Sequence, residues 1–543
     1  MLKIKSIKDA VHGYIRLEEP FWRIIDTAEF QRLKWIEQTS YRVLYPSARH
    51  DRFIHSIGVY HLGKKAINGL IKNCSNDLTD IINDNKFSFL LACLLHDIGH
   101  APFSHTCEDL YNYNEKISNI ESSLNAELLK ELKNGISEED FCCFQDDYKD
   151  IISPNGKPPS EHEIMSAIIS CEKYNEYKDF FNPNIKLNLD LIVRSILGCS
   201  YKTKRLDPPD KELGIKNCLI RLLNSSTVDV DKLDYIARDT QMTGYENIEL
   251  DTERLLDNIT IIEKEGIYYP AFKKGALSII NNVVIAKNSQ AQWIVNHPVV
   301  IYDSYILRLA IGATLKKFKK KTLSLKKIIN EIFSSKTLSK AGVCFGNQRF
   351  SLLSDVDILY LMKGNLENCF VSEYFSRDKR KKPIWKSHNE FYYYLECRDD
   401  KASEISLFLA PILSFFKSKN ELDFPNQIDN ELYKQIESDK SIQGKDELLK
   451  IIKTLLDYNG NDNKYVILPA KNSFYAKIDS KNLYICFDSE NQEYESYDNF
   501  NKNEDTKIKP YEFFYLYSEN KIEPKEFLTY LYDIAHKELD VRI

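Results

Sequence analysis

The sequence lacks several features that mark specialised classes of protein. Its 12 cysteines include no Cys-x-x-Cys spacing, so there is no zinc or redox motif of that kind. Only 18 glycines and 17 prolines occur in 543 residues, which excludes a fibrous or low-complexity chain. No apolar run approaches the roughly 18 residues of a membrane-spanning helix, and the N-terminus lacks the apolar core of a secretory signal. We therefore expect a cytoplasmic protein with reduced cysteines and no membrane partner.

An excess of positive charge is also missing. The formal net charge is −6 and the isoelectric point is about 6.1, which argues against a protein that coats nucleic acid. A hydrophobic content of 43% is that of an ordinary folded protein, and the length exceeds what one hydrophobic core usually serves. We expect two lobes, and a nucleotide partner that is small rather than polymeric.

The spacing of apolar residues predicts a helical first lobe. Between about residues 20 and 310 they recur mainly at helical intervals, and a long helix is expected at 274–316. A short strand is expected at 266–272. The segment 111–160 is rich in Asn, Lys, Glu and Asp and ends in a proline-containing loop, which indicates a lid or an insertion. The basic run at 316–321 marks the expected boundary, so the first lobe is predicted to span residues 1–320.

The second lobe, residues 321–543, is predicted to be smaller and α+β. Three β-prone runs stand at 392–395, 465–468 and 483–487. Helical patterns stand near 400–418 and 445–458. The acidic, Asn-rich stretch 488–509 is expected to be a surface loop. The fold class is therefore mainly α, with a helical lobe followed by an α+β lobe of unknown role.

Three segments of the first lobe concentrate imidazole and carboxylate groups. His55 stands at the start of one amphipathic helix, and Asp231 stands in the first turn of another. The pair His96-Asp97 follows a strongly apolar helix that Gly99 interrupts. Buried polar groups cost several kcal/mol unless they are paired or bound to metal. Imidazole and carboxylate ligands together suit a divalent ion, and Mn, Mg, Fe and Zn all remain open.

A single histidine on an apolar helix is more often an ordinary core residue than a ligand, and we interpret His12 and His61 in that way. The density of imidazoles and carboxylates between residues 96 and 105 argues against that interpretation for the cluster. On the helix of Asp231, the residues Asp234 and Arg238 stand at i and i+4, and we expect them to form a structural ion pair.

The same segments resemble a known family. His55, the His96-Asp97 pair and Asp231 reproduce the H…HD…D signature of HD-superfamily phosphohydrolases. Four longer segments resemble the deoxynucleoside triphosphate triphosphohydrolases of that superfamily. They are the opening DAVHGYIRL, then RFIHSIGV, LLHDIGHAPFSH and DVDKLDYIARD. The similarity covers roughly residues 5–110 and 155–240, with a weaker trace between 353 and 385.

The resemblance implies a metal-dependent enzyme that hydrolyses a deoxynucleoside triphosphate (dNTP) to deoxynucleoside and tripolyphosphate. At the family level it also suggests a preference for dGTP, a homo-oligomer and a role in depleting nucleotides against phage. The family's metal ligands fall on His55, His96, Asp97 and Asp231. Its catalytic histidines fall on His100 and His162, and its supporting acid falls on Glu108, where relatives usually carry Asp. Its substrate contacts fall on Arg52, His105, Lys232 and Tyr235 for the phosphates and on Gln38 and Asp239 for the sugar.

Residue chemistry agrees with these assignments. Arg52, Lys232 and His105 are suited to stabilise phosphate charge. Either His162 or His100 is able to protonate a leaving oxygen, because imidazole titrates near neutral pH. Some relatives place a basic residue on the γ-phosphate, and we find no convincing counterpart of it in this sequence. The corresponding region contains Asn296, His297 and Pro298.

A regulatory nucleotide is a further implication of the resemblance. Nucleotide-regulated relatives bind guanine near their N-terminus, where this chain has Lys5, Asp26, Gln31 and Lys34. Lys34 replaces an arginine, which removes the bidentate geometry of that contact. The same four residues would equally serve to brace a subunit interface.

Two alternatives to a dNTP triphosphohydrolase stay open. The first is an HD phosphohydrolase that acts on a nucleoside monophosphate, a cyclic nucleotide or single-stranded nucleic acid. The second is a non-catalytic nucleotide sensor that signals through the C-terminal lobe. His100, His162 and the complete set of metal ligands favour an enzyme over a sensor.

Overall fold

The computed structural model describes residues 3–153, 155–202, 210–245, 250–317, 324–345, 348–458, 463–470, 478–488, 493–500 and 513–540. The chain forms two compact units. Unit 1 comprises Met1–Gln290, Lys319–Leu359 and Lys477–Asp505, and unit 2 comprises Ala291–Phe318, Tyr360–Ala476 and Thr506–Ile543. This division differs from a single boundary near residue 320, because the chain returns to unit 1 twice.

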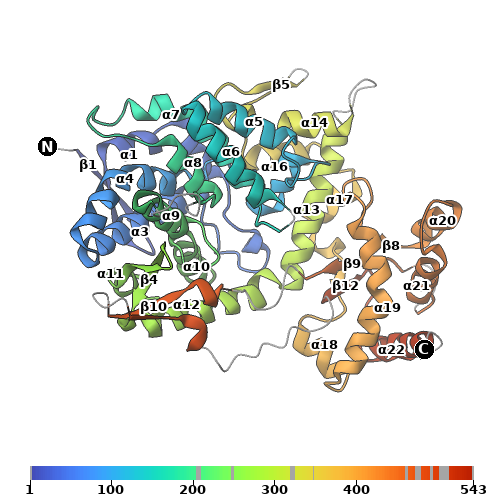
Figure 1. Ribbon diagram of the computed structural model, residues 1–543. Helices are drawn as coiled ribbons and strands as arrows, with labels where there is room; N and C mark the ends of the chain where they lie inside the picture. Colours follow the sequence, from blue (N-terminus) through green and yellow to red (C-terminus); the bar gives the residue numbers. More distant parts are fainter. Residues whose placement is uncertain are drawn as a thin grey trace. The chain divides into compact units, whose positions relative to one another are not determined.

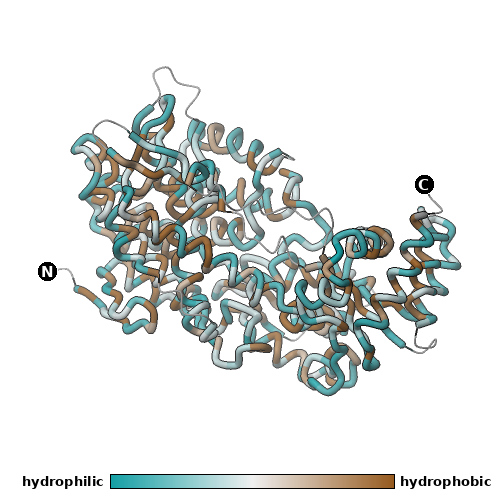
Figure 2. Tube along the Cα trace, turned by 90° about the horizontal axis from the view of Figure 1, so that it is seen from below, coloured by the Kyte–Doolittle hydropathy of each residue, from teal (hydrophilic) through white to brown (hydrophobic). Residues whose placement is uncertain are grey.

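Unit 1 is built mainly from helices, as the sequence predicts (Figure 1). The central helix is α3 (Arg52–Asn73), which packs against α4 (Asn76–Leu95), α10 (Val230–Thr243) and α11 (Thr252–Asp257). The other helices that begin in unit 1 are α1 (Glu19–Ile25), α2 (Ala28–Gln31), α5 (Ser123–Lys133), α6 (Glu138–Ile152), α7 (Glu161–Lys178), α8 (Leu189–Leu197), α9 (Lys211–Leu223), α12 (Leu277–Gln290), α14 (Leu325–Ile332), α15 (Ser335–Leu338) and α16 (Asp355–Lys363). In Figure 2 apolar residues recur along these helices between hydrophilic ones, the pattern of helices that bury one face.

Strands in unit 1 form three small sheets. An antiparallel hairpin pairs β1 (Ile4–Asp9) with β2 (Gly13–Glu18), and another pairs β5 (Val343–Phe345) with β6 (Gln348–Phe350). The largest sheet has the order β11-β10-β4-β3. Its β3 (Ile259–Lys264) and β4 (Ile267–Lys273) are antiparallel, while β10 (Tyr484–Asp488) lies parallel to β4 and β11 (Glu493–Ser496) completes the edge. Strand pairing therefore ties a late segment of the chain into unit 1.

Unit 2 combines helices with one antiparallel sheet of order β7-β12-β9-β8. Its strands are β7 (Lys382–Pro383), β8 (Gln427–Ile428), β9 (Tyr465–Pro469) and β12 (Phe514–Ser518). Its helices are α13 (Pro298–Lys316), α17 (Cys369–Phe375), α18 (His388–Tyr394), α19 (Asp399–Lys417), α20 (Asn430–Ser438), α21 (Lys445–Asp457) and α22 (Pro524–Asp540). One hydrophobic core joins them, with Trp385, Phe391 and Phe514 fully buried in it.

Most elements predicted from the sequence pattern are confirmed. The expected strands at 266–272, 465–468 and 483–487 correspond to β4, β9 and β10, and the helices near 400–418 and 445–458 correspond to α19 and α21. The segment 111–160 contains α5 and α6, and its function as a lid stays a prediction. Residues 318–321 of the basic run, and 489–492 and 501–509 of the expected acidic loop, lie outside the described residues, while β11 occupies part of that loop.

Two predictions of local structure are wrong. The run 392–395 is not a strand, because 392–394 form the end of α18, where Ser387 caps the helix by accepting a hydrogen bond from the Glu390 amide. A good cap and a buried Phe391 outweigh the β-propensity of consecutive tyrosines. The expected helix 274–316 is interrupted by a π-helical turn, Ala291–Val295, after which Pro298 begins α13.

Helix α13 was not anticipated as a candidate membrane span. Among the helices within the described ranges, it alone is long and apolar enough by composition to cross a membrane. However, 83% of the apolar window is buried inside the protein. Burial in a protein core therefore accounts for its apolar composition.

Helices α3 and α10 pack closely because Gly58 has no side chain. A Cβ atom at Gly58 would lie 1.9 Å from the Asp234 carboxylate and 2.5 Å from the Arg238 guanidinium. Both of these groups are fully buried. Any side chain at position 58 would therefore displace a buried charged pair.

We expect Gly58→Ala to lower the free energy of unfolding by on the order of 2 kcal/mol, because overpacking a closed interface forces side chains out of place. Urea denaturation provides the measurement. Gly63→Ala on the same helix is the comparison, because its Cβ would meet only uncharged side chains, with Cys93 Sγ at 2.8 Å and Phe89 Cε1 at 3.4 Å the nearest atoms. A Gly58→Ala protein at least as stable as the Gly63→Ala protein would contradict the expectation.

Candidate active site

Four helices of unit 1 bring the predicted side chains together. His55 lies in the first turn of α3, Asp231 in the first turn of α10, and His162 in the first turn of α7. His96 and Asp97 directly follow the last residue of α4. The site thus lies where three helices begin and one ends.

Local capping fixes where these helices begin. The Asp51 carboxylate accepts a hydrogen bond from the Ile54 amide at the start of α3, and Asp229 accepts one from the Lys232 amide at the start of α10. Ser160 begins α7 with a capping box. These caps satisfy amides that a helix leaves unpaired and hold the first turns in register.

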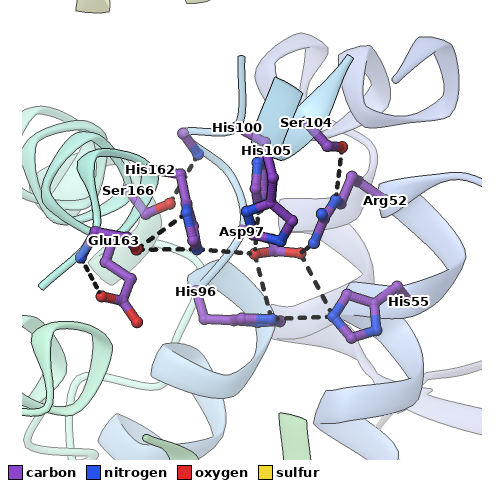
Figure 3. Close-up of polar contacts among 12 residues, drawn as sticks. Arg52, His55, His96, Asp97, His100, Ser104, His105, His162, Glu163 and Ser166 are labelled. Atoms are coloured by element: carbon purple, nitrogen blue, oxygen red, sulfur yellow. Dashed lines mark hydrogen bonds and ion pairs between the residues drawn. The ribbon is translucent and has the colours of Figure 1, made fainter. Parts of the chain in front are cut away.

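The four predicted metal ligands converge on one point. His55 Nε2 lies 3.1 Å from Asp231 Oδ1 and 3.4 Å from Asp97 Oδ2. His96 Nε2 lies 3.3 Å from His55 Nε2, 3.5 Å from Asp97 Oδ1 and 3.6 Å from Asp231 Oδ1. Figure 3 shows the Asp97 carboxylate between these histidines and the other side chains of the site.

The donor set fits a divalent cation. Metal bonds of about 2.0–2.2 Å place neighbouring ligand atoms roughly 3.0–3.6 Å apart, which is the spacing found here. His55, His96 and Asp97 are all buried and offer ligand atoms within 4.8 Å of one another. Asp231 adds a second carboxylate. Two imidazoles and two carboxylates are ligands that several divalent metals accept, so the donor set does not identify the metal.

Hydrogen bonds orient both metal-facing imidazoles. The Nδ1 of His96 donates to the Cys93 carbonyl at 2.9 Å, which leaves its Nε2 lone pair facing the centre. The Nδ1 of His55 lies 2.7 Å from Asp234 Oδ2. Such carboxylate–histidine pairs fix the ring and raise its basicity as a ligand.

Asp234 has a larger role than the ion pair predicted for it. Arg238 does donate to both of its oxygens, at 2.8 and 2.9 Å. The same carboxylate also meets His55 and, at 2.6 Å, Nε2 of His12. Burial raises the pKa of Asp234, but Arg238 and the two histidines outweigh it and hold that pKa well below the usual range. Sequence spacing gave no sign of these histidine contacts.

Carboxylate charge dominates the electrostatics of the centre. Burial lowers the pKa of His55, but Asp231 and Asp234 outweigh this effect and raise the pKa to about 9. For Asp97 the effect of burial has the opposite sign and raises the pKa, but the charges of Arg52 and His96 outweigh it and hold that pKa well below the usual range. The centre therefore attracts positive charge, as a cation site must.

A second histidine group lies on the other side of Asp97. His100 Nε2 is 3.1 Å and His162 Nε2 is 4.0 Å from Asp97 Oδ1. The rings of His100 and His162 stack with centroids 4.0 Å apart and an interplanar angle of 14°. Both rings thus place Nε2 near the same Asp97 oxygen, and imidazoles are side chains that transfer protons near neutral pH. The third imidazole of the group is His105.

Glu108 connects this group. Its Oε2 lies 2.6 Å from His105 Nδ1 and 3.1 Å from His162 Nδ1. Burial lowers the pKa of His162, but the Glu108 charge outweighs it and raises the pKa to about 9. Burial, Arg52 and His162 together hold the pKa of His100 well below its ordinary value. The two histidines therefore differ in protonation, which the sequence did not distinguish.

The predicted phosphate contacts lie around the centre with partners of their own. Arg52 donates to Asp97 Oδ2 at 2.7 Å and to the Ser104 hydroxyl at 2.9 Å. Lys232 Nζ donates to the Ser225 carbonyl at 2.7 Å and pairs with Asp229. Burial raises the pKa of Tyr235 well above 10, so its phenol stays protonated.

The two predicted sugar contacts differ in whether their side-chain oxygens already have hydrogen-bond partners. Both Asp239 oxygens are engaged, one with His50 Nε2 at 2.7 Å and the other with the Gln290 amide at 2.5 Å. Gln38 is 3% exposed, and its Oε1 has no hydrogen-bond partner within the segments described. A buried, unpartnered acceptor is suited to a ligand donor.

Lys287 on α12 was missed by the sequence reasoning. Burial lowers its pKa to about 8, and the nearby charge of Lys232 adds to the effect. Its Nζ makes no ion pair or hydrogen bond with any residue in the described part of the chain. An ammonium group held beside another cation is suited to an anion. A lysine in an ordinary helical pattern carries no signal of this position.

The four predicted regulatory residues have contacts within unit 1. Lys5 Nζ pairs with Asp26 at 2.7 Å, and both side chains are exposed. The Gln31 amide donates to the Ile25 carbonyl, and Lys34 lies over the Phe53 ring. Their regulatory role stays a prediction.

Comparison with known proteins finds a domain match over part of this site, from His55 to His162. A family model described as HD domain matches residues 52–174. A solved structure of a hypothetical protein from Aquifex aeolicus has the same fold, with a TM-score of 0.50 and 17% identity over 99% of this chain and 100% of that chain.

Curated relatives match about half of the chain. An uncharacterized protein from Methanocaldococcus jannaschii is 28% identical over 60% of this chain and 53% of its own length. A protein named deoxynucleoside triphosphate triphosphohydrolase SAMHD1, from Gallus gallus, is 30% identical over 48% of this chain and 37% of its own length, and a homolog from Dictyostelium discoideum is 28% identical over 48% and 40%. The matches thus span about half or less of each relative. Residues 52–174 therefore match an HD domain, and about half of the chain is similar to proteins named deoxynucleoside triphosphate triphosphohydrolase.

Proposed function

We propose that this protein is a metal-dependent hydrolase that converts a dNTP and water to a deoxynucleoside and tripolyphosphate. The observation that carries the proposal is the Asp97 carboxylate, which meets His55 and His96 on one side and lies 3.1 Å from His100 and 4.0 Å from His162 on the other. A metal-ligand group and a proton-transfer group thus share one residue. The names of the relatives support the choice of substrate.

In this reaction a water oxygen bonds to the α-phosphorus and the bond from phosphorus to the 5′ oxygen breaks. The leaving oxygen takes up a proton and becomes the 5′ hydroxyl. His162 is the residue suited to supply it, because Glu108 holds its Nδ1 and leaves Nε2 on the side of Asp97. His100 is not suited to this role, because burial holds its pKa well below the ordinary value and its ring therefore carries no acidic proton near neutral pH.

His55, His96, Asp97 and Asp231 would hold the metal. A divalent ion supplies two things to phosphoester hydrolysis, a lower pKa for a water molecule and neutralisation of phosphate charge. Arg52 lies beside Asp97 and is suited to a phosphate oxygen. Lys287, with no partner among the described residues, is suited to the far end of a triphosphate.

Removing one ligand tests the metal site. We expect His96→Ala to lose bound divalent metal, measured by elemental analysis of purified protein, and to lose at least about a hundredfold in kcat, since even the outer partners of metal ligands matter by ten- to a hundredfold. His536→Ala is the control, because its imidazole is exposed and pairs with Glu404 in unit 2. Retention of metal and activity by His96→Ala would refute the site.

Product analysis tests the reaction itself. Each dNTP and NTP, and a single-stranded oligonucleotide, would be incubated with metal-loaded protein and the phosphate products resolved. We expect tripolyphosphate and deoxynucleoside from at least one dNTP. Pyrophosphate or monophosphate in their place would instead support an HD phosphohydrolase of different substrate class.

The titration of Lys287 predicts a pH dependence. Its pKa of about 8 means that the ammonium form is present below pH 8 and is lost as the pH rises through that value. We therefore expect kcat/KM for the dNTP to decline above about pH 8. Lys287→Met should reduce kcat/KM at pH 7 by on the order of ten- to a hundredfold, the worth of a charged hydrogen bond.

Lys287→Arg is the matched variant, because arginine keeps its charge at this pH. We expect it to shift the alkaline decline upward by more than one pH unit. Lys274→Met, on an exposed 3-10 turn, is the control and should leave the profile unchanged. An alkaline decline that is identical in the Lys287→Arg protein would show that another group titrates.

A further inference from the structure

The loop that follows the His-Asp pair is held by side chains from outside the HD domain. Arg32 precedes the matched region and is 3% exposed. Its guanidinium donates to the Ile98 carbonyl at 2.8 Å and to the His100 carbonyl at 3.0 Å. It also donates to the Leu353 carbonyl at 2.9 Å. One buried cation therefore joins the loop to a segment about 250 residues later in the chain.

Asp355 holds the same loop from its other end. Its two carboxylate oxygens accept one amide each, from Phe103 at 2.6 Å and from Glu37 at 2.9 Å. Asp355 is 5% exposed and begins α16, two residues after Leu353, whose carbonyl Arg32 binds. Burial raises its pKa to about 7, with the two amides and the Arg32 charge acting against that rise and Glu37 adding to it. A carboxylate in this position needs both amide donors.

The loop requires external support because its backbone is strained. Phe103 and Ser104 have φ values of 60° and 51°, so two consecutive residues with side chains adopt the left-handed region. Residues other than glycine disfavour this region. The Ser104 hydroxyl donates to the Glu37 carbonyl at 2.6 Å and accepts from Arg52. The strained turn thus stands between Asp355 and the active-site arginine.

We propose that Arg32 and Asp355 are positioning residues that clamp the backbone of residues 98–104 and thereby set the places of His100 and His105. Between their contacts, the Gly99 carbonyl accepts a hydrogen bond from the Tyr111 hydroxyl at 2.9 Å. Three successive carbonyls are consequently fixed by side chains rather than by a helix. The expected effect on catalysis rests on the proposed hydrolase function, whereas the expected effect on the loop rests on these contacts alone.

The clamp separates two properties of the site. Of the four expected metal ligands, His55 and Asp231 lie in helices α3 and α10, and His96 and Asp97 are the two residues directly after α4, before the first carbonyl that Arg32 binds. Their positions therefore follow from the helices rather than from residues 98–104. His100 and His105 lie on the loop itself. Loosening the clamp should therefore reduce catalysis while metal binding persists.

Asp355→Asn is the direct test, because the amide has the same shape but offers one acceptor and places an NH2 group against the other donor. We expect faster hydrogen exchange, by mass spectrometry, in peptides covering residues 99–106, with exchange elsewhere unchanged. We also expect kcat to fall about tenfold, KM to stay within about twofold and metal affinity to stay the same. Arg32→Lys should move the same readouts in the same direction.

Asp190→Asn is the matched control. Asp190 is another buried carboxylate of unit 1, 6% exposed, and its two oxygens accept from the Arg194 guanidinium at 2.9 and 3.0 Å on helix α8, away from Arg32 and Asp355. We expect it to leave exchange at 99–106 and kcat unchanged.

Exchange at 99–106 that is unaltered in the Asp355→Asn protein would overturn the clamp, as would faster exchange spread over the whole chain or a loss of metal affinity. The exchange and metal measurements need no substrate. A wild-type protein without dNTP hydrolysis would thus refute the proposed function, while the exchange result would still decide on the clamp.

Discussion

The Asp97 carboxylate occupies a buried position where a lone negative charge would be costly, and the surrounding site compensates that charge. Its side chain is 2% exposed and lies within 4.0 Å of Arg52, His55, His96 and His100. Arg52 and His55 come from the first turn of α3 and face Asp97 Oδ2, whereas His96 and His100 lie within three residues of Asp97 in the chain and face Oδ1. Because the charge has to be balanced there, the helices that carry its partners have to meet there.

The close approach of α3 and α10 serves the same centre. Gly58 lets the Asp234 carboxylate reach across to His55, and Arg238 and His12 balance the charge of Asp234 in turn. A chain of alternating charges thus runs from the interior of unit 1 to the metal-facing nitrogen of His55. The close packing of α3 on α10 is consequently also what orients the His55 ring.

Much of the centre was predictable because its ligands stand beside strong local signals. His96 and Asp97 end an apolar helix, and His55 and Asp231 lie in first turns that caps begin. The roles of Lys287, Asp234 and Asp355 were not predictable in this way. The sequence around each of them indicates only a helix. Their roles depend on the groups that folding places beside them, which are Lys232, His55 and the Phe103 amide respectively.

The sequence by itself determined the mainly helical fold and predicted which imidazoles and carboxylates gather at one centre, because periodicity, capping and residue type are local properties. Only the tertiary structure distinguished His162 from His100, since Glu108 lies 3.1 Å from His162 and raises its pKa, whereas burial lowers the pKa of His100. It also decided that residues 484–488 join the sheet of β3 and β4, and that Asp355 reaches the loop at Phe103. Pairing between distant strands and the desolvation of charges depend on contacts across hundreds of residues, which no local pattern encodes.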